Sequence, residues 1–357
     1  MRGAVLLNVH AQTARKPGTR FLLFCVFLIT LLSFTGCKRT TPRAAPYRAE
    51  SVLGTICTIT LYEQATAKIY QDIFGRLREI ENLMSVNLPD TDVARINAAA
   101  GIEPVQVDDE VFTVIERALY YAGISGGAFD PTVGPLVSLW GIATDHPRVP
   151  SQEEIDAVLP LINWRDVELD REHSRVFLKR PGMALDLGGI AKGYAADEAA
   201  AIIRGTRLRR AIVDLGGNVF VYGEKPDRTP WRVGIQNPLG NRGSYIGVVE
   251  GKNITVVTTG IYERNFEKDG TLYHHVFSPS DGYPVNNGLM SVSIVAGISM
   301  NADALSTAVF VLGYEKGLAL LESLDGVEGV FVFEDMSVRT TSGANFSITD
   351  QNYRLLP

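Results

Sequence analysis

The succession of strand-like segments after Ala211 constrains the fold of this chain more than any other feature. Runs rich in valine, isoleucine and threonine follow one another there, separated by turn residues, at residues 211–222, 231–235, 245–249, 254–259, 288–298, 329–333 and 337–341. Strands joined by short connections pair antiparallel, whereas parallel strands need a longer crossover, usually a helix. The sequence therefore predicts an α+β fold with a largely antiparallel sheet core and flanking helices.

Helical spacing of apolar residues predicts the helices that flank this sheet. They are expected at residues 67–84, 92–100, 109–123, 151–159, 194–203, 300–312 and 314–324. A first strand is predicted at 51–62, a short one at 105–107, and a hairpin at 167–169 and 175–179. Residues 125–140 contain three glycines and two prolines, so we expect an irregular loop there.

The N-terminus has the pattern of a bacterial export signal. Basic residues precede an uninterrupted apolar run of 12 residues at 21–32, which is shorter than the ~20 residues that a membrane span needs. The small residues before Cys37 resemble a lipobox. Residues 1–36 are therefore predicted to be a lipoprotein signal peptide, and Cys37 is predicted to carry lipid. A cleaved soluble form and an uncleaved anchor are the alternatives.

The remaining segments divide into a tether and a folded part. Residues 37–50 are polar and contain prolines, as expected of a tether, and residues 51–357 are predicted to form one domain. The predicted location is extracytoplasmic, with a lipid anchor in a bacterial membrane, at the periplasmic face of an inner membrane. A net charge of −6 without a block of like charge argues against nucleic acid as a partner, and favours small molecules or proteins.

Cysteine content excludes a disulfide framework. Of the three cysteines, Cys25 lies in the predicted signal and Cys37 is the predicted lipidation site, so only Cys57 remains. Cys57 lies in an apolar strand-like run. A small buried core residue is therefore expected at this position in preference to a nucleophile.

The segment Met183–Ala200 is the first candidate for a ligand site. An apolar run ends on Asp186, a glycine pair follows at Gly188 and Gly189, and Lys192 precedes an alanine-rich helical pattern. Glycines let the backbone approach a ligand, a helix N-terminus presents free N–H groups, and lysine adds a positive charge. The spacing differs from that of a Walker A loop. The segment predicts an anion-binding turn, with a plain tight turn and a surface lysine as the alternative.

A second candidate lies at Ser299–Val309. On a helix Asp303 and Thr307 are four residues apart and face the same way. A carboxylate and a hydroxyl among small alanines can hold a hard cation through oxygen ligands. The alternative is that Asp303 is a plain N-terminal charge and Thr307 bonds to a helix carbonyl. Together the two segments suggest Mg²⁺ and a phosphorylated ligand.

Several short motifs occur in an order that resembles one known family. They are Leu53-Gly54-Thr55, Met84-Ser85, the run Phe129–Val137, Leu139-Trp140-Gly141, the run Asp186–Tyr194, the run Asp214–Asn218, Thr259-Gly260, His275-Val276-x-x-Pro279 and Ala302-Asp303-Ala304-x-x-Thr307-Ala308. From about residue 50 to the end the chain resembles the FAD:protein FMN transferases, the ApbE lipoprotein family. The resemblance implies an ApbE-like fold and a Mg²⁺-dependent extracytoplasmic enzyme. Such an enzyme cleaves FAD, attaches FMN through a phosphoester bond to a threonine of a partner protein, and releases AMP.

The same resemblance implies roles for individual residues. The implied metal ligands are the carbonyl of Gly189, the carboxylate of Asp303, the carbonyl of Ser306, and Thr307. The implied FAD contacts are Leu53, Ala128, Phe129, Asp130, Asp186, Lys192, His275 and Val276. His275 is also the implied general base, whereas His274 is expected on the opposite strand face, at the surface. The implied acceptors are flavin-carrying subunits of membrane redox complexes of the Rnf and Nqr type.

Two positions depart from the pattern of many relatives. Ser278 stands before Pro279 where an aspartate is common, which affects the surroundings of His275. Asn87 stands where some relatives carry tyrosine, and in the spirochaete branch an asparagine there accompanies hydrolysis of FAD to FMN and AMP. Asn87 therefore motivates the hypothesis of an FAD pyrophosphatase activity. A non-catalytic flavin-binding or flavin-storage lipoprotein and a purely structural envelope lipoprotein are the rival interpretations.

Overall fold

The computed structural model describes residues 46–142, 144–241 and 243–357. The predicted signal peptide, the predicted lipidation site Cys37 and most of the predicted tether lie outside these residues. The described residues all belong to one compact unit. Its first strand, β1 (Tyr47–Val52), begins inside the segment predicted as a tether, so residues 47–50 belong to the sheet instead. Within the described part of the chain, no helix has both the length and the apolar character needed to cross a membrane.

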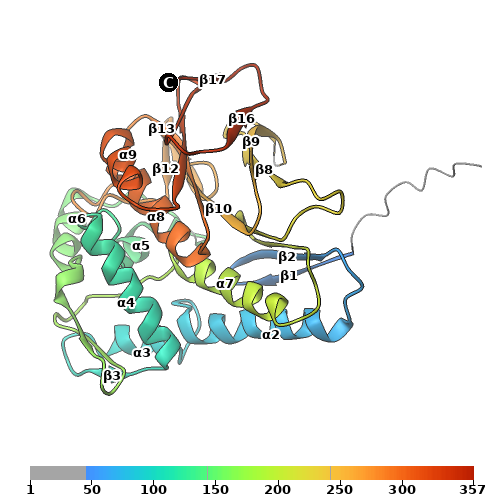
Figure 1. Cartoon of the computed structure of the whole chain (residues 1–357). Helices are drawn as coiled ribbons and strands as arrows, with labels where there is room; N and C mark the ends of the chain where they lie inside the picture. Colours follow the sequence, from blue (N-terminus) through green and yellow to red (C-terminus); the bar gives the residue numbers. More distant parts are fainter. Residues whose placement is uncertain (1–45, 143, 242) are drawn as a thin grey trace, which may run out of the picture. The chain divides into compact units, whose positions relative to one another are not determined.

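A nine-stranded sheet organises the described part of the chain (Figure 1). Its strands run in the order β1, β2 (Thr55–Leu61), β6 (Ala211–Leu215), β7 (Asn218–Tyr222), β10 (Ile254–Gly260), β13 (Leu289–Ala296), β14 (Glu328–Phe333), β15 (Ser337–Thr340) and β17 (Arg354–Leu355). Every neighbouring pair is antiparallel except β15 and β17 at one edge. The predicted α+β class with a largely antiparallel core is confirmed.

Three smaller sheets complete the strands. They are β8 (Trp231–Gln236), β9 (Tyr245–Gly251) and β16 (Phe346–Ile348); β3 (Val105–Gln106), β4 (Val167–Asp170) and β5 (Arg175–Leu178); and the hairpin β11 (Asn265–Lys268) with β12 (Thr271–His274). The β4–β5 hairpin was predicted from the sequence. The β11–β12 hairpin was not, and it leads directly to His275.

Helices lie on one face of the large sheet and the β8–β9–β16 sheet covers the other (Figure 1). The helices are α2 (Ala67–Met84), α3 (Asp92–Ala98), α4 (Asp109–Ile124), α5 (Gly134–Trp140), α6 (Gln152–Val158), α7 (Ala191–Arg204), α8 (Ser299–Leu312) and α9 (Tyr314–Glu322), with short 3₁₀ turns at Leu159–Leu161 and Trp164–Asp166. Strand periodicity explains the two cores on opposite faces of the large sheet, because alternate side chains point to opposite faces. Phe331 joins the core under the helices, and its neighbours Val330 and Val332 join the other. A third cluster, around α5 and α6, contains Leu136, Trp140 and Phe277.

Two predicted strands are hairpins. The 51–62 segment turns at Leu53-Gly54, where φ is 56° and 65°. The 211–222 segment turns at Gly216-Gly217, where φ is 66° and 96°. Two consecutive positive φ angles suit the turn that joins twisted antiparallel strands, and glycine adopts them at little cost. The glycines therefore mark reversals of the chain rather than interruptions of one strand.

Two further expectations were wrong in detail. Residues 125–140 are not irregular throughout, because α5 begins at Gly134 with Pro135 in its first turn, and the left-handed Gly141 ends it. The run at 183–186 is not a strand of the sheet, since its bridge to Val133 is a single isolated one. Instead the Asn97 side chain pairs with the backbone of Leu185, accepting its N–H at 2.7 Å and donating to its C=O at 3.0 Å. This pairing holds the chain just before Gly188.

Candidate active site

The start of α7 and the first turns of α8 meet at a shared group of polar atoms. Lys192 Nζ donates to the carbonyl oxygen of Gly188 at 2.9 Å and lies 3.6 Å from Asp303 Oδ1. The backbone N–H of Gly193 donates to the other oxygen, Asp303 Oδ2, at 2.8 Å. The Asp303 side chain is only 5% exposed, whereas that of Lys192 is 26% exposed. The two sequence segments predicted to form one site are therefore in direct contact.

Hydroxyl and carbonyl oxygens extend this group on the other side. A methyl group placed on Gly189 would lie 3.3 Å from Thr307 Oγ1, so the glycine bend passes close to that hydroxyl. Thr259 Oγ1, at the end of β10, lies 2.8 Å from Ser306 Oγ and 3.5 Å from Thr307 Oγ1. The buried Ser306 hydroxyl donates to the carbonyl of Asp303 at 2.8 Å. Gly189, Asp303, Ser306 and Thr307 thus lie together, as the predicted metal site requires.

Glycine at position 193 is required by the packing of α7 on α8. A Cβ atom there would lie 2.4 Å from the Ser299 carbonyl oxygen and 2.6 Å from Met300 Cα, both backbone atoms. We expect Gly193→Ala to lower the free energy of unfolding by about 1–3 kcal/mol, measured by urea titration, because the helices must move apart. Gly75→Ala is the matched control. Gly75 lies inside α2 with no atom near its missing Cβ, so alanine should stabilise by about 0.5–1 kcal/mol. Equal stability of the two variants would contradict this packing argument.

His275 follows β12 and has a defined tautomer. Its backbone N–H donates to the carbonyl oxygen of Arg264 at 3.1 Å, and its Nδ1 lies 3.2 Å from the same oxygen. A carbonyl can only accept, so Nδ1 carries the proton and Nε2 keeps a free lone pair. Burial, with smaller contributions from the charges of Arg264, His274 and Lys192, lowers the pKa of His275 to about 4, although the hydrogen bond to the Arg264 carbonyl acts in the opposite direction. His275 is therefore neutral at pH 7 and able to accept a proton at Nε2.

His274 is buried, so its expected surface position was wrong. Its side chain is 4% exposed, its Nε2 donates to the carbonyl of Val285 at 2.8 Å, and the N–H of Val276 donates to its Nδ1 at 3.3 Å. The ring also meets Phe310 edge-on, with 6.0 Å between centroids. Burial lowers the pKa of His274. The two histidines do point to different sides, but the side opposite His275 is core rather than solvent.

The predicted FAD-binding loop at Ala128, Phe129 and Asp130 is held rigid from within. Both oxygens of Asp130 are engaged: Oδ1 accepts the Thr132 N–H at 2.8 Å, and Oδ2 accepts the Trp164 N–H at 3.1 Å. Burial raises the pKa of Asp130. The Phe129 ring would lie 3.1 Å from a methyl group on Gly189. The structure thus brings Phe129 to the glycine bend, and Asp130 shapes the loop from inside.

Of the other predicted contacts, only Asp186 is tied directly to this bend among the described contacts. Asp186 Oδ1 accepts the Gly188 N–H at 2.7 Å and fixes the approach to Gly189. Leu53 occupies the β1–β2 turn. The carbonyl oxygen of the next residue, Gly54, accepts a long hydrogen bond of 3.5 Å from the Arg264 guanidinium. Val276 is 5% exposed, so its side chain belongs to the core.

Asn87 lies on the exposed segment after α2. Its backbone N–H donates to Ser85 Oγ at 3.1 Å, and the residue is exposed. The last turn of α2 is in turn tied to the β1–β2 turn, because Gly54 N–H donates to Glu81 Oε1 at 3.3 Å. Asn87 is therefore three residues beyond the end of a helix that contacts the β1–β2 turn.

Cys57 is a core residue, as predicted. It is fully buried in β2 and its thiol contacts the carbonyl oxygen of Val52 at 3.4 Å. Burial, with smaller contributions from Asp214 and Glu81, raises the pKa of Cys57 to about 12. A thiol held protonated in this way is not a nucleophile at neutral pH.

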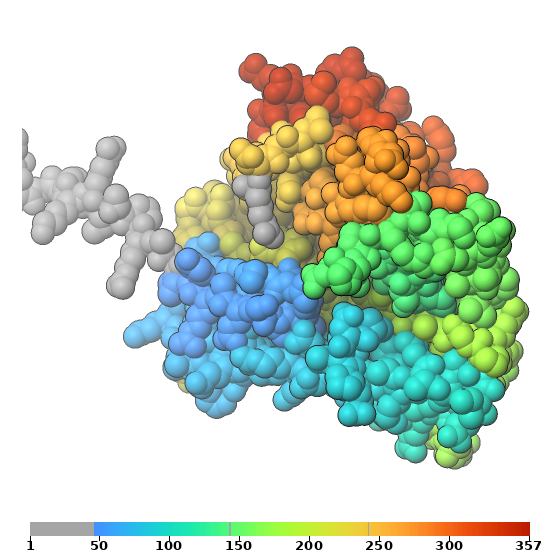
Figure 2. Space-filling view, turned by 180° about the vertical axis from the view of Figure 1, so that it is seen from behind, coloured from blue at the N-terminus to red at the C-terminus, as the bar shows by residue number. Residues whose placement is uncertain are grey.

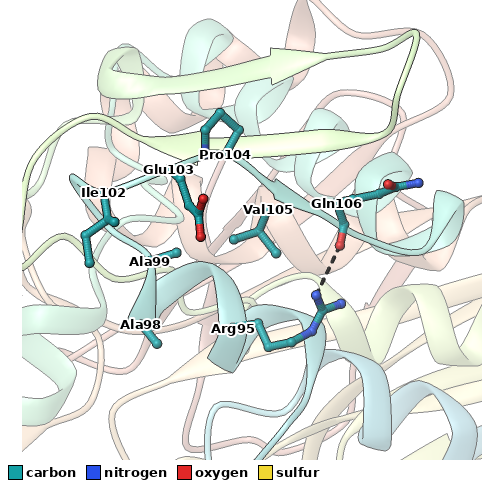
Figure 3. Close-up of a pocket in the computed structure, with 8 residues that line it drawn as sticks. All are labelled: Arg95, Ala98, Ala99, Ile102, Glu103, Pro104, Val105 and Gln106. Carbon is teal, nitrogen blue, oxygen red and sulfur yellow. Dashed lines mark hydrogen bonds between the residues drawn. The ribbon is translucent and has the colours of Figure 1, made fainter.

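The surface of the described residues is hollowed in several places. Figure 2 shows a hollow where the blue, green and orange parts of the chain approach one another, around residues 50–70, 130–150 and 260–285. A different hollow of about 520 Å³ lies beside α3 and β3, where the Arg95 guanidinium donates to the Gln106 carbonyl (Figure 3). Its lining contains none of the predicted site residues. A third, of about 250 Å³, includes Tyr262 and Glu263 and so borders the turn that holds His275.

Sequence reasoning missed two residues that shape the site. Thr259 was recognised as part of a motif but not as a partner of Ser306 and Thr307. Asn97 was not singled out, although its amide holds Leu185. A threonine followed by glycine at the end of a strand was the available signal for Thr259. For Asn97 no local signal existed, because its partner is 88 residues away.

The sequence profile of the ApbE family matches residues 53–331, which is most of the chain. This chain belongs to the ApbE family. Its relatives in the family include the FAD:protein FMN transferase of Treponema pallidum, which is 41% identical over 313 residues and aligns over 83% of this chain and 86% of its own length. The FAD:protein FMN transferase of Klebsiella pneumoniae is 36% identical over 307 residues, aligning over 85% of this chain and 95% of its own.

Solved ApbE structures share the fold. The ApbE protein of Thermotoga maritima superposes with a TM-score of 0.75 at 34% identity, covering 86% of this chain and 97% of its own. The flavin transferase ApbE of Vibrio cholerae gives a TM-score of 0.74 at 28% identity, with the same coverage. The ApbE-like fold predicted from the motifs is therefore confirmed.

Proposed function

We propose that this ApbE-family chain is an FAD:protein FMN transferase. Such an enzyme cleaves the diphosphate of FAD, attaches FMN through a phosphoester bond to a threonine of an acceptor protein, and releases AMP. The relatives in Treponema pallidum and Klebsiella pneumoniae bear this name. The structural observation that carries the proposal is the contact between the glycine turn and α8, where Lys192 Nζ lies 3.6 Å from Asp303 Oδ1.

The oxygen atoms beside Lys192 fit a hard cation, and we infer that Mg²⁺ binds there. Asp303 is a buried carboxylate whose two oxygens meet only the Gly193 N–H and Lys192 among the contacts of the described chain. The Gly189 bend and the Thr307 hydroxyl lie next to it and would supply neutral oxygens, with the Ser306 carbonyl as the fourth ligand. Mg²⁺ prefers a few protein oxygens and completes its shell with water and phosphate. Once bound, Mg²⁺ neutralises charge on the two phosphates.

The protein's own groups account for positioning and proton transfer. Lys192 places a positive charge at the start of α7, where the diphosphate of FAD would lie, and Phe129 packs beside the glycine bend. His275 Nε2 accepts the proton of the acceptor threonine hydroxyl. The threonine oxygen forms a bond to the phosphorus on the FMN side, the bridging P–O bond breaks, and its electron pair leaves with AMP.

An acceptor assay tests the proposed reaction. The mature chain is mixed with FAD, Mg²⁺ and a flavin-carrying subunit of a redox complex of the Rnf or Nqr type, our proposed class of acceptor. We expect flavin fluorescence that stays on the acceptor in a denaturing gel and depends on Mg²⁺. FAD bound without turnover, under the same conditions, would instead support a flavin-binding or flavin-storage protein. An acceptor whose threonine is replaced by valine is the control.

We also propose a slower hydrolysis of FAD to FMN and AMP when no acceptor is present. Asn87 motivates this second activity, and because the residue is exposed its side chain is accessible to a substrate. We expect AMP to accumulate when the chain is incubated with FAD and Mg²⁺ alone, measured by chromatography. Asn87→Tyr should lower AMP release several-fold while transfer to an acceptor continues. Finding no AMP with the wild-type chain would exclude the pyrophosphatase activity.

The proposed location follows from the N-terminal sequence alone. We propose that the chain is exported and held by lipid on Cys37, on the outer side of a bacterial inner membrane. Metabolic labelling with a radioactive fatty acid, followed by fractionation, tests this proposal. Cys37→Ser should abolish the label and release the protein from the membrane fraction.

A further inference from the structure

The first turn of α8 is capped by a residue of another helix. Ile298 stands at the N-cap position and offers no side-chain acceptor. The first two N–H groups, those of Ser299 and Met300, donate instead to the two carboxylate oxygens of Asp197 in α7, at 2.9 and 2.8 Å. Helix N-termini leave such N–H groups without partners inside the helix. Asp197 therefore supplies the cap that the sequence of α8 lacks.

This cap belongs to one continuous contact between α7 and α8. Asp197 lies four residues after Gly193, so both face the same side of α7. Gly193 packs on the backbone of Ser299 and Met300, and its N–H binds Asp303 Oδ2. Asp303 lies one turn beyond Ser299. The first turn of α8 is thus held at its start by Asp197, which binds Ser299 and Met300, and at its end by Gly193, which binds Asp303. These contacts set the position of Asp303.

We propose that Asp197 is a positioning residue for the metal site. Among the described contacts it meets no proposed ligand of Mg²⁺ or FAD. It fixes the rotation of α8 about its axis and the position of α8 along that axis, so that the Asp303 carboxylate lies beside Lys192. This inference rests on the proposed function, because it concerns the affinity of that metal site. Residues that orient metal ligands from outside typically change metal affinity by about 10- to 100-fold when replaced.

Glu198 offers a matched control on the same helix. It follows Asp197 directly but points the other way, where its carboxylate pairs with Arg76 of α2 at 2.9 Å. Replacing Glu198 disturbs the anchoring of α7 without touching α8. The Ser299 hydroxyl donates to Asn218 Oδ1 at 2.7 Å and is untouched in every variant, which helps α8 to stay on the sheet.

The experiment measures binding of Mn²⁺, an electron paramagnetic resonance probe for a Mg²⁺ site, to the mature chain. We compare wild type, Asp197→Ala, Asp197→Asn and Glu198→Ala, and measure the urea stability of each. Asp197→Ala should weaken Mn²⁺ binding on the order of tenfold or more. Asp197→Asn keeps a side-chain oxygen that can accept an N–H, as at ordinary N-caps, and should restore most of the affinity. Glu198→Ala should lower stability and leave Mn²⁺ affinity near that of wild type.

Two results would overturn the inference, and they differ from failure of the proposed function. Equal Mn²⁺ affinity in wild type and Asp197→Ala would show that the cap does not position Asp303. Equal weakening in Asp197→Ala and Glu198→Ala would show an effect of general destabilisation. Absence of Mn²⁺ binding in the wild-type chain would reject the metal site itself, and with it any role for Asp197 there. Should Asp197→Ala not fold, Asp197→Ser takes its place under the same criteria, because its single, shorter hydroxyl cannot accept the N–H groups of both Ser299 and Met300.

Discussion

Replacing Asp303 by asparagine should reduce FMN transfer on the order of a thousandfold, because the site then loses its carboxylate. Asparagine is nearly isosteric and can still accept the Gly193 N–H that reaches Asp303 Oδ2 at 2.8 Å. The change therefore removes charge with little change in packing. A bound metal contributes several kcal/mol of charge stabilisation to phosphoryl transfer, and each 1.4 kcal/mol corresponds to a factor of ten in rate. Initial rates of acceptor flavinylation, measured at saturating FAD across a Mg²⁺ series, give the effect.

A buried aspartate elsewhere in the fold provides the control for Asp303. Asp92 on α3 is 7% exposed and accepts the Asp108 N–H at 2.6 Å. Asp92→Asn should lower stability modestly and leave the transfer rate of the folded enzyme unchanged. If Asp303→Asn transfers FMN within tenfold of wild type at the same Mg²⁺ concentration, the assignment of Asp303 to the metal is wrong.

Replacing His275 by alanine should lower the rate of transfer by about a hundred- to a thousandfold, the range typical of a lost general base. FAD affinity should change only a few-fold, because in the proposed site the diphosphate is held by Lys192 and by the cation on the α8 oxygens. Rates come from the acceptor assay and affinity from calorimetry with FAD. His173→Ala removes an exposed imidazole whose partner among the described residues is Asp170 in its own loop, and should change neither quantity. A His275 variant that loses FAD affinity as steeply as rate would indicate a binding role instead.

The pH dependence gives a second view of His275. Because its pKa is lowered to about 4, the base remains unprotonated throughout the neutral range, and the rate should fall only as pH approaches 4. Stability behaves differently. An unfolded histidine takes up a proton near pH 6.5, whereas the folded one does not until about pH 4. The unfolded state then binds more protons, so His275 makes the fold less stable as pH falls from about 6.5 to about 4.

The sequence was sufficient to predict the class of fold, because hydrophobic periodicity is a local property. The strand-like runs after Ala211, joined by short connections, predict the antiparallel sheet. The helical spacing of apolar residues predicts α2, α4, α8 and α9 nearly to their ends. Turns inside β-branched runs were harder to recognise. Leu53 adopts a positive φ that few residues other than glycine, asparagine or aspartate favour. The sequence pattern therefore predicts one continuous strand at residues 51–62 and does not indicate the turn.

The site was predictable where its residues lie in one segment and unpredictable where distant segments cooperate. Asp303 and Thr307 were identified by helical spacing, and Lys192 by its glycine turn. Asp197 looks like any carboxylate in an alanine-rich helix, and its partners lie more than a hundred residues away. His274 was misplaced because alternation tells which residues face apart, but not which face is covered by other elements.

The hydrogen bond between Gly193 and Asp303 joins positions 110 residues apart in the chain. The chain between them runs through strands β6 to β13, so this bond closes a long loop. Contacts between segments so far apart form only after the loop between them has closed, and such contacts slow folding. We therefore expect the contact between α7 and α8, and with it the proposed metal site, to form late in folding.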